Sequence, residues 1–444
     1  MRVASSPSEA PLPRCPTVVV NLRRMEDSMT TTSPRPDLAA LTERFLAVRA
    51  RTDRLTRDLG PEDQTPQSMT EASPTKWHRA HTTWFFEEFV LGADPAYRPR
   101  DPAFRYLFNS YYEAVGERHP RAARGHVTRP GVAEVAAYRQ DVEEQLVARL
   151  EDGTLDEALL DLVELGCHHE EQHQELLLMD VKHLLSGNVL QPVYVERAPD
   201  PDPAADPLPQ RWTHVPGGVT HIGDDGSGFA FDNERPRHRV WLDDVEVGTR
   251  QVTNADWVQF IDDGGYARPD LWLSDGWATL QATGWDAPGY WRPDDDHGWT
   301  TFTLSGRRPV VAAEPVCHIS FFEADAFARW AGHRLPTEQE WEARAVSGHQ
   351  THGGLLDAER CHPGPAAEVT FGDVWEWTAS AYLPYPGFET APGAVGEYNG
   401  KFMNDQHVLR GASAVTPPDH PRTTYRNFFP AASRWAFSGL RLAR

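Results

Sequence analysis

Apolar residues in the first half of the chain recur every three or four positions, which is the spacing of amphipathic helices. Four segments show this pattern, at residues 38–48, 77–91, 132–150 and 159–185. Each segment can bury its apolar face only by packing against other elements. We therefore expect a helical bundle over residues 36–195.

The connection between the second and third predicted helices, residues 92–130, lacks this regular spacing and is rich in aromatic residues and arginines. Connections of such length are uncommon inside compact domains and are often functional. We expect this connection to contribute to a binding or catalytic site.

The pattern changes after residues 196–210, a segment rich in proline and aspartate that is typical of an extended linker. Residues 211–444 contain 13 of the 15 tryptophans, many Gly and Asp turns, and short alternating stretches such as 240–247. Helical spacing recurs only briefly, at 254–262 and 321–332. The sequence thus predicts a two-domain α+β protein, with a helical bundle followed by an irregular α+β domain.

The charge balance excludes several classes of partner. The chain has 43 Lys and Arg residues against 65 Asp and Glu residues, a formal net charge of −22. Such a surface repels phosphate backbones and anionic lipids, so neither nucleic acid nor a membrane is an expected partner. No apolar run approaches the ~18 residues that span a bilayer. We expect a cytoplasmic protein whose first residues, 1–35, form a disordered tail.

The segment of residues 167–177 carries the most specific chemistry. His169 and His173 lie four positions apart in a proline-free run, so on a helix their imidazoles are about 40° apart around the axis and can reach one metal ion. Glu175 lies about 120° from His169 on the same wheel and should hydrogen-bond or pack instead. A third ligand is then expected from another helix.

Two other interpretations of this segment remain open. Histidines in a charged helix are commonly solvated, and a spacing of four arises by chance in a chain with 19 histidines. The stretch from His169 to His173 also matches H-E-x-x-H, the zinc-hydrolase helix in which the glutamate, here Glu170, is a general base. The glycine and third histidine that continue this motif in metzincins do not follow.

The second half contains a series of short motifs in a fixed order. They are residues 215–218 (VPGG), 232–238 (DNERPRH), 252–254 (VTN), 332–342 (GHRLPTEQEWE), 372–378 (GDVWEWT) and 409–413 (LRGAS). Through them this half resembles the formylglycine-generating-enzyme-like sulfatase-modifying domain, a variant of the C-type lectin fold. Formylglycine synthesis uses a cysteine pair near the C-terminus, whereas the last cysteine here is Cys361. That activity is therefore not expected.

The first half resembles the DinB-like four-helix metal-binding bundle, through residues 77–87 (WHRAHTTWFFE) and the later histidine pair. The resemblance implies that His81 joins His169 and His173 as a metal ligand. His78 is the alternative to His81.

A DinB-like bundle followed by a formylglycine-generating-like domain is the arrangement of the iron-dependent sulfoxide synthases of ergothioneine biosynthesis, which this chain resembles over nearly everything after the tail. The resemblance implies an iron(II)- and O2-dependent enzyme that joins cysteine sulfur to C2 of the hercynine (Nα-trimethylhistidine) imidazole, as a sulfoxide. Alternatives within the class are γ-glutamylcysteine as the thiol, and the ovothiol-type enzyme that attacks C5 of histidine. A zinc hydrolase and a non-catalytic lectin-like protein are the alternatives from other classes.

The same resemblance implies further site residues. Gln172 matches a position that touches the hercynine imidazole, and Asn427 and Phe428 match a polar and an aromatic contact of a substrate loop. Tyr112, or else Tyr111, would supply a proton or hydrogen atom. A solvated position remains the alternative for Gln172, and core packing for the tyrosines.

Three arginines and one phenylalanine complete the candidates. Arg121 and Arg124 could bind a substrate carboxylate or be solvated, and Arg426 could contact substrate or pair with a structural carboxylate. Phe429 stands where relatives that use γ-glutamylcysteine have an aspartate that helps to hold the amine end of that substrate. The resemblance therefore implies a preference for cysteine, whereas the pair Arg121 and Arg124 could instead serve a longer, more anionic thiol.

Overall fold

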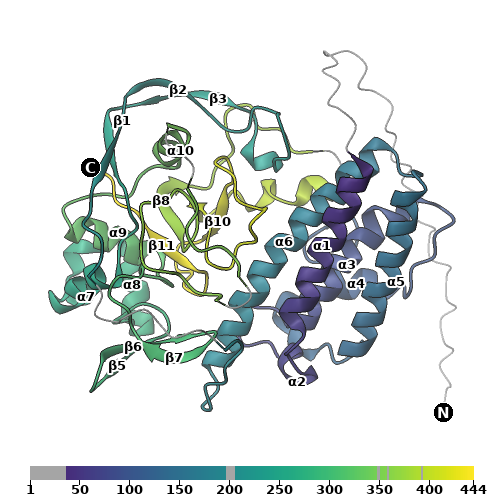
Figure 1. Ribbon diagram of the computed structural model, residues 1–444, viewed down its shortest axis with the longest axis horizontal. Helices are drawn as coiled ribbons and strands as arrows, with labels where there is room; N and C mark the ends of the chain where they lie inside the picture. The colour runs from purple at the N-terminus through teal and green to yellow at the C-terminus, as the bar shows by residue number, and fades with distance from the viewer. Residues whose placement is uncertain (1–36, 197–205, 348–350, 358–359, 392–393) are drawn as a thin grey trace, which may run out of the picture. The chain divides into compact units, whose positions relative to one another are not determined.

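Four long helices form the bundle that the apolar spacing predicts (Figure 1). In this computed structural model they are α1 (Leu38–Thr56), α3 (Thr75–Phe89), α5 (Val132–Glu151) and α6 (Glu157–Ser186). Helices α5 and α6 each pack on both α1 and α3. The predicted helical bundle is confirmed.

The structure describes residues 37–196, 206–347, 351–357, 360–391 and 394–444. The expected tail at residues 1–35 and residues 197–205 of the expected linker lie outside the described residues. No helix in the described part of the chain is both long and apolar enough to cross a membrane.

The 30-residue helix α6 contributes to both halves of the protein. Asp156 caps its first turn by accepting a hydrogen bond from the Leu159 N–H (3.0 Å). Val163 lies in the bundle core, whereas Leu178 and Val181 pack in a second cluster with residues of the C-terminal half. The residues between these two ends can therefore reach both halves.

The long connection between α3 and α5 contains the short helices η1 (Leu91–Ala93), α4 (Phe104–Phe108) and η2 (Arg121–His126). Between α4 and η2 the chain is held by the buried side chain of Asn109, which accepts from the Tyr112 N–H (3.0 Å) and donates to the Tyr112 carbonyl (2.9 Å). This turn fixes where the backbone presents Tyr111 and Tyr112.

The described C-terminal half contains small sheets rather than one large one. The pairs are β1 (Trp212–Val215) with β4 (Val245–Gly248), β2 (Gly218–Ile222) with β3 (His238–Leu242), and β5 (Trp291–Asp294) with β6 (Gly298–Thr303) and β7 (Gly306–Pro309), all antiparallel. The largest sheet has the order β10 (Asn427–Pro430), β9 (Gln406–Gly411), β8 (Trp375–Ala381) and β11 (Ser438–Leu440). In this sheet β11 runs parallel to β8, and the other pairs are antiparallel.

The secondary structure predicted for this half is partly confirmed. Helices α7 (Asn254–Asp262) and α9 (Phe321–Trp330) coincide with the two helical patches. The alternating stretch 240–247 is two strands, because the chain leaves β3 and enters β4, which has a different partner. Helices α8 (Ser274–Thr283) and α10 (Glu338–Ser347) were not predicted; α10 buries only Trp341 and Ala345 as apolar residues, too few to give a helical pattern.

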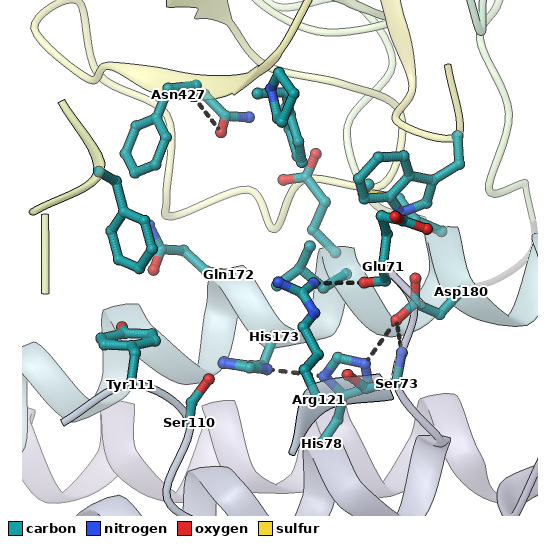
Figure 2. A pocket seen from close by; sticks show the side chains of 18 of the residues that line it. Glu71, Ser73, His78, Ser110, Tyr111, Arg121, Gln172, His173, Asp180 and Asn427 are labelled. Carbon is teal, nitrogen blue, oxygen red and sulfur yellow. Dashed lines mark hydrogen bonds and ion pairs between the residues drawn. The ribbon is translucent and has the colours of Figure 1, made fainter. Parts of the chain in front are cut away.

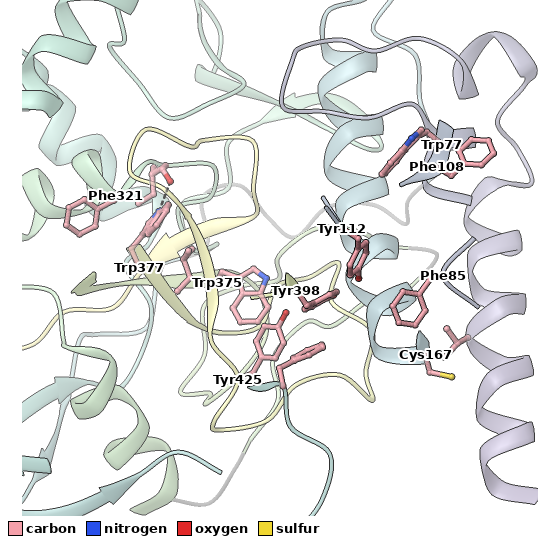
Figure 3. Close-up of a cluster of buried hydrophobic side chains, with 14 of the residues drawn as sticks. Trp77, Phe85, Phe108, Tyr112, Cys167, Phe321, Trp375, Trp377, Tyr398 and Tyr425 are labelled. Atoms are coloured by element: carbon pink, nitrogen blue, oxygen red, sulfur yellow. Dashed lines mark hydrogen bonds between the residues drawn. The ribbon is translucent and has the colours of Figure 1, made fainter. Parts of the chain in front are cut away.

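One hydrophobic core continues from the bundle into the C-terminal half (Figure 3). It includes Phe85 and Cys167 of the bundle, Tyr112 of the long connection, and Trp375 and Tyr398 of the C-terminal half. Residues 37–444 accordingly form one compact unit. A site at the contact between the halves therefore rests on a packed core rather than on loops alone.

Candidate metal centre and substrate cavity

Three histidines from two bundle helices converge on one point, and two of them, His81 and His169, are buried. His81 projects from α3, and His169 and His173 project from successive turns of α6. One ligand nitrogen from each ring lies within 4.8 Å of the other two, and His81 Nε2 is 3.2 Å from His169 Nε2. The i, i+4 spacing thus places two rings together, and the third comes from another helix, as expected.

Packing and hydrogen bonding fix the orientation of His81. Its ring stacks between Trp77 (centroids 4.6 Å apart) and Trp84 (5.6 Å). Its Nδ1–H donates to the Phe108 carbonyl at 2.6 Å, which leaves Nε2 without a proton in the neutral ring. The free lone pair is therefore directed at the histidine cluster.

The electrostatic environment keeps all three rings uncharged. Burial lowers the pKa of His169 to about 3. Burial and the neighbouring histidines also hold the pKa values of His81 and His173 well below their usual range. Neutral imidazole is the form that binds a metal ion, so the three residues present fit a metal centre.

A cavity of about 320 Å³ opens beside this centre (Figure 2). His173 is part of its wall. The other lining residues include Trp77, His78, Gln172 and Asp180 of the bundle, Ser110, Tyr111, Arg121 and Arg124 of the long connection, and Tyr398, Phe402, Tyr425, Asn427, Phe428, Phe429 and Trp435 of the C-terminal half. The cavity therefore belongs to both halves, which is a common location for a ligand site.

Gln172 is held between two tyrosines of the C-terminal half. Its side-chain N–H donates to the Tyr425 hydroxyl at 2.6 Å, and its carbonyl accepts from the Tyr398 hydroxyl. Asn427 and Phe428 lie on β10 and line the same cavity. The structure thus brings Gln172, Asn427 and Phe428 together, and Gln172 is not a solvated helix residue.

The two tyrosines of the long connection take different positions. Tyr111 lines the cavity, whereas Tyr112 is fully buried and does not. Tyr112 packs on Tyr111 (ring centroids 4.7 Å apart) and on Trp84 (5.8 Å). Tyr398 and Tyr425 also line the cavity, and the Tyr398 ring lies 5.5 Å from that of His169. Of the paired tyrosines, Tyr111 therefore meets the cavity directly, and Tyr112 meets it only through Tyr111.

The three candidate arginines separate into two groups. Arg121 and Arg124 line the cavity, and the buried Arg124 guanidinium lies 3.4 Å from the centre of the Trp77 ring and donates to Ser73 Oγ (2.9 Å). Arg426 is outside the cavity lining and pairs with buried Glu338 at 2.8 and 3.0 Å. Its predicted substrate contact is corrected to the structural ion pair that was the alternative.

Glu170 is not free to act as the base of a zinc hydrolase. It is fully buried and accepts from Arg49 Nη1 (2.9 Å), Arg139 Nη2 (2.5 Å) and Thr52 Oγ1 (2.6 Å). Burial alone would raise the pKa of Glu170, but Arg139 and Arg49 lower it to about 2. A carboxylate so paired is a poor proton acceptor at neutral pH. The H-E-x-x-H interpretation is therefore wrong for this segment.

Two further carboxylates of α6 connect the halves. Glu175 accepts from the Trp375 indole N–H and from the Ser413 (2.9 Å) and Thr416 (3.0 Å) hydroxyls, so it hydrogen-bonds rather than ligates, as expected. Glu171 forms a second buried cluster with His168 of α6 and His420 of the C-terminal half.

No sequence pattern singles out Tyr398, Tyr425 or Asp180 as site residues. Both tyrosines lie in segments where no periodicity distinguishes a site residue from a core residue. Asp180 lies on α6, seven positions after His173, which is two turns along one face. That spacing was the one available signal for it.

Comparison with known proteins matches both halves of the chain. Residues 44–177 match the DinB superfamily, and residues 197–359 and 368–444 match the sulfatase-modifying factor enzyme 1-like domain. Hercynine oxygenase from Mycolicibacterium smegmatis is 34% identical over 84% of this chain and 91% of its own length. Hercynine oxygenase from Mycobacterium tuberculosis is 34% identical over 89% of this chain and 96% of its own length. A formylglycine-generating enzyme from Streptomyces coelicolor is 34% identical over 53% of this chain.

Proposed function

We propose that this chain, which belongs to the hercynine oxygenase family, is an iron(II)-dependent enzyme that uses O2 to couple a thiol to hercynine in ergothioneine biosynthesis. The observation that carries the proposal is the position of the neutral three-histidine cluster beside a cavity lined by both halves. The overall reaction balances. The thiol S–H and the imidazole C2–H each lose one hydrogen, and a C–S bond forms. One atom of O2 is added to sulfur, and the other leaves as water with the two hydrogens.

The donor set suits iron(II). Three neutral imidazoles leave the full charge of the ion uncompensated, which favours binding of an anionic thiolate, and leave up to three positions of an octahedron open. Iron held by His81, His169 and His173 would supply the site for the thiolate and for reduction of O2. A zinc hydrolase would need a base, and Glu170 is already paired.

Hercynine recognition is assigned to residues that line the cavity. The Gln172 amide, fixed by Tyr398 and Tyr425, offers a directed hydrogen bond to the substrate imidazole. The trimethylammonium group cannot donate hydrogen bonds, so aromatic faces such as Phe428 and acceptors such as the Asn427 carbonyl suit it.

The proton or hydrogen donor is assigned to the tyrosine cluster, with Tyr111 ahead of Tyr112 because only Tyr111 lines the cavity. Burial holds the pKa of Tyr111 well above its usual range, so the phenol keeps its proton until the reaction needs it. Phenylalanine variants at Tyr111, Tyr112 and Tyr398 separate the candidates. The donor's variant should retain iron while sulfinic acid from the thiol replaces part of the sulfoxide. Unchanged product ratios in Tyr111→Phe would remove it from this role.

The thiol is proposed to be cysteine. Phe429 lines the cavity and packs 5.4 Å from the Trp435 ring, so it presents an apolar surface where a carboxylate would be needed to pair with the distant ammonium of a γ-glutamyl arm. Arg121 and Arg124 can serve the cysteine carboxylate. The measurement is kcat/KM for both thiols at fixed hercynine. A preference for γ-glutamylcysteine of about tenfold, or about 1.4 kcal/mol of transition-state binding, would overturn the assignment.

The function itself is tested with protein purified without oxygen. Metal analysis should find iron, and addition of hercynine, cysteine and then O2 should give the sulfoxide by mass spectrometry. Stoichiometric zinc in protein that forms no sulfoxide with either thiol after iron is added would contradict the proposal.

A further inference from the structure

The cavity wall contains a chain of three hydrogen-bonded side chains that ends on one of the proposed metal ligands (Figure 2). His78 Nδ1 lies 2.8 Å from His173 Nδ1, and His78 Nε2 lies 3.0 Å from Asp180 Oδ2. Asp180 Oδ2 also accepts from the Ser73 backbone N–H at 2.8 Å. The hydrogen bonds join α3 to α6, and His78 and Asp180 are both buried.

The chemistry of these groups sets the direction of each hydrogen bond. A carboxylate only accepts, so the proton between His78 and Asp180 belongs to His78 Nε2. In a neutral imidazole the other nitrogen, His78 Nδ1, can then only accept. The proton of the second hydrogen bond must come from His173 Nδ1, which leaves His173 Nε2 with a free lone pair.

We infer that His78 and Asp180 are positioning residues that hold His173 in the Nδ1–H tautomer, with its Nε2 directed at the metal centre. His81 is held in the same tautomer, because its Nδ1–H donates to the Phe108 carbonyl. A carboxylate at the far end of the His78 link raises the basicity of the ligating nitrogen through the intervening ring. His78 is thereby a support of the ligand set rather than a member of it.

The location of these hydrogen-bonded side chains has a consequence for substrate binding. Both His78 and Asp180 line the cavity, so the support of His173 is part of the surface that substrate meets. A substrate cation placed near Asp180 would compete with His78 for the carboxylate. Ser73 limits this competition, because its backbone N–H fixes Asp180 Oδ2 in position.

This inference rests on the proposed metal site, and the test separates the two. Iron(II) affinity of the full-length chain is measured without oxygen by competition with a chelator. His78→Phe keeps a ring of similar size and removes the acceptor, and Asp180→Ala removes the end of the chain. Each is expected to bind iron(II) 10–100-fold more weakly than the wild type. Asp180→Asn keeps an acceptor without the charge, so its affinity should lie between those of Asp180→Ala and the wild type.

The control is His183→Asn, which removes another α6 histidine whose Nδ1 contacts Ser68 Oγ (2.8 Å) and which has no part in the chain. It should bind iron as the wild type does. Nitrogen-15 spectra of histidine-labelled full-length protein before iron is added provide a direct reading of the tautomer. His173 should be protonated at Nδ1 in the wild type and lose this preference in His78→Phe.

Wild-type protein that bound no iron would contradict the proposed function. If the wild type and both folded variants bound iron equally, or if His173 carried its proton on Nε2, only the present inference would be overturned. If His78→Phe fails to fold, the iron(II) affinities of Asp180→Ala, Asp180→Asn and the wild type test the inference instead.

Discussion

Helix α6 carries two histidine clusters built from neighbouring residues, and they differ in their charged contacts. The first is the candidate metal centre with His169 and His173, and the second joins His168 and Glu171 to His420 of the C-terminal half. In the second cluster His168 Nδ1, His420 Nδ1 and Glu171 Oε2 lie 3.2–3.3 Å from one another. By the spacing of ligand atoms alone, both clusters could hold a metal ion.

Neighbouring charges distinguish the second cluster. Glu171 already forms ion pairs with Arg44 (3.2 Å) and Arg51 (3.4 Å), in addition to its contacts with the two histidines. Burial would raise the pKa of Glu171, but hydrogen bonds from His168 and His420 hold it well below its usual range. A divalent cation there would lie beside two guanidinium groups, which Coulomb repulsion opposes. We interpret this cluster as a contact that joins the bundle to the C-terminal half.

Convergent donors can hold a metal ion only when their own hydrogen bonds leave the ligand lone pairs free. In the first cluster, His81 and His173 donate from Nδ1 to groups that accept, and their Nε2 atoms remain available. In the second cluster the nitrogens that converge are the same ones that serve Glu171.

The largest effect is expected from the adjacent pair His169→Ala and His168→Ala. His169→Ala should lose iron and lower kcat/KM by about 1000-fold or more, about 4 kcal/mol of transition-state stabilisation, because the remaining imidazoles hold the ion poorly. His168→Ala should keep stoichiometric iron and lose stability instead. Iron content and kcat/KM are measured on both. Iron loss in His168→Ala equal to that in His169→Ala would abolish the distinction between the clusters.

In the sequence, Glu170 lies between His169 of the first cluster and Glu171 of the second, and it belongs to neither cluster. Glu170→Gln therefore tests whether a buried charge on α6 affects only the residues that it contacts. Breaking its buried pairs with Arg49 and Arg139 should cost about 3–5 kcal/mol of unfolding free energy while iron binding is retained in the folded fraction. Chemical denaturation and metal analysis check the two parts. Intact stability with lost activity would return Glu170 to a catalytic role.

The stabilisation that the Glu170 carboxylate contributes depends on pH in a defined direction. The pKa of Glu170 falls from an ordinary 4.5 to about 2 in the folded protein, so the unfolded chain binds more protons between these values. The stabilisation by Glu170 is present above pH 4.5 and is lost as the pH falls toward 2. The wild type should therefore lose its advantage over Glu170→Gln across this window, and a constant difference would contradict the ion-pair account.

Much of the fold could be predicted because apolar spacing reports local structure. The four bundle helices and α7 follow from periodicity, and the identity of the C-terminal domain follows from ordered motifs. Helix α10 was missed because Trp341 and Ala345 are its only buried apolar residues. The alternating stretch 240–247 could not show that its two strands have different partners.

The site divides in a similar way. His169 and His173 are visible as a pair because their contact is local. The choice between His78 and His81 depends on contacts with Asp180 and Phe108, which lie 102 and 27 positions away. Tyr425 reaches Gln172 across 253 positions. Such contacts leave no periodic trace in one sequence.

Glu171→Gln should have a moderate effect confined to the second cluster. The glutamine keeps one acceptor but loses the charge that holds Arg44 and Arg51, so about 1–3 kcal/mol of unfolding free energy should be lost. Iron content should not change, since the ligands of the first cluster are untouched. Thermal or chemical unfolding gives the stability, and a variant as stable as the wild type would show that the second cluster does not join the halves.

The smallest effect on stability, and the sharpest test of the electrostatic argument, is expected from the double variant Arg44→Met/Arg51→Met. Both side chains are partly exposed, at 29% and 16%, so their loss should cost about 1 kcal/mol or less. Removing both guanidiniums also removes the repulsion that keeps a cation from His168, Glu171 and His420. Titration of iron-loaded protein with Zn²⁺ should then show a second binding site in the variant and none in the wild type. A second Zn²⁺ site of equal affinity in the wild type would mean that the geometry of the donor atoms alone determines metal binding. Neighbouring charges would then not distinguish the two clusters.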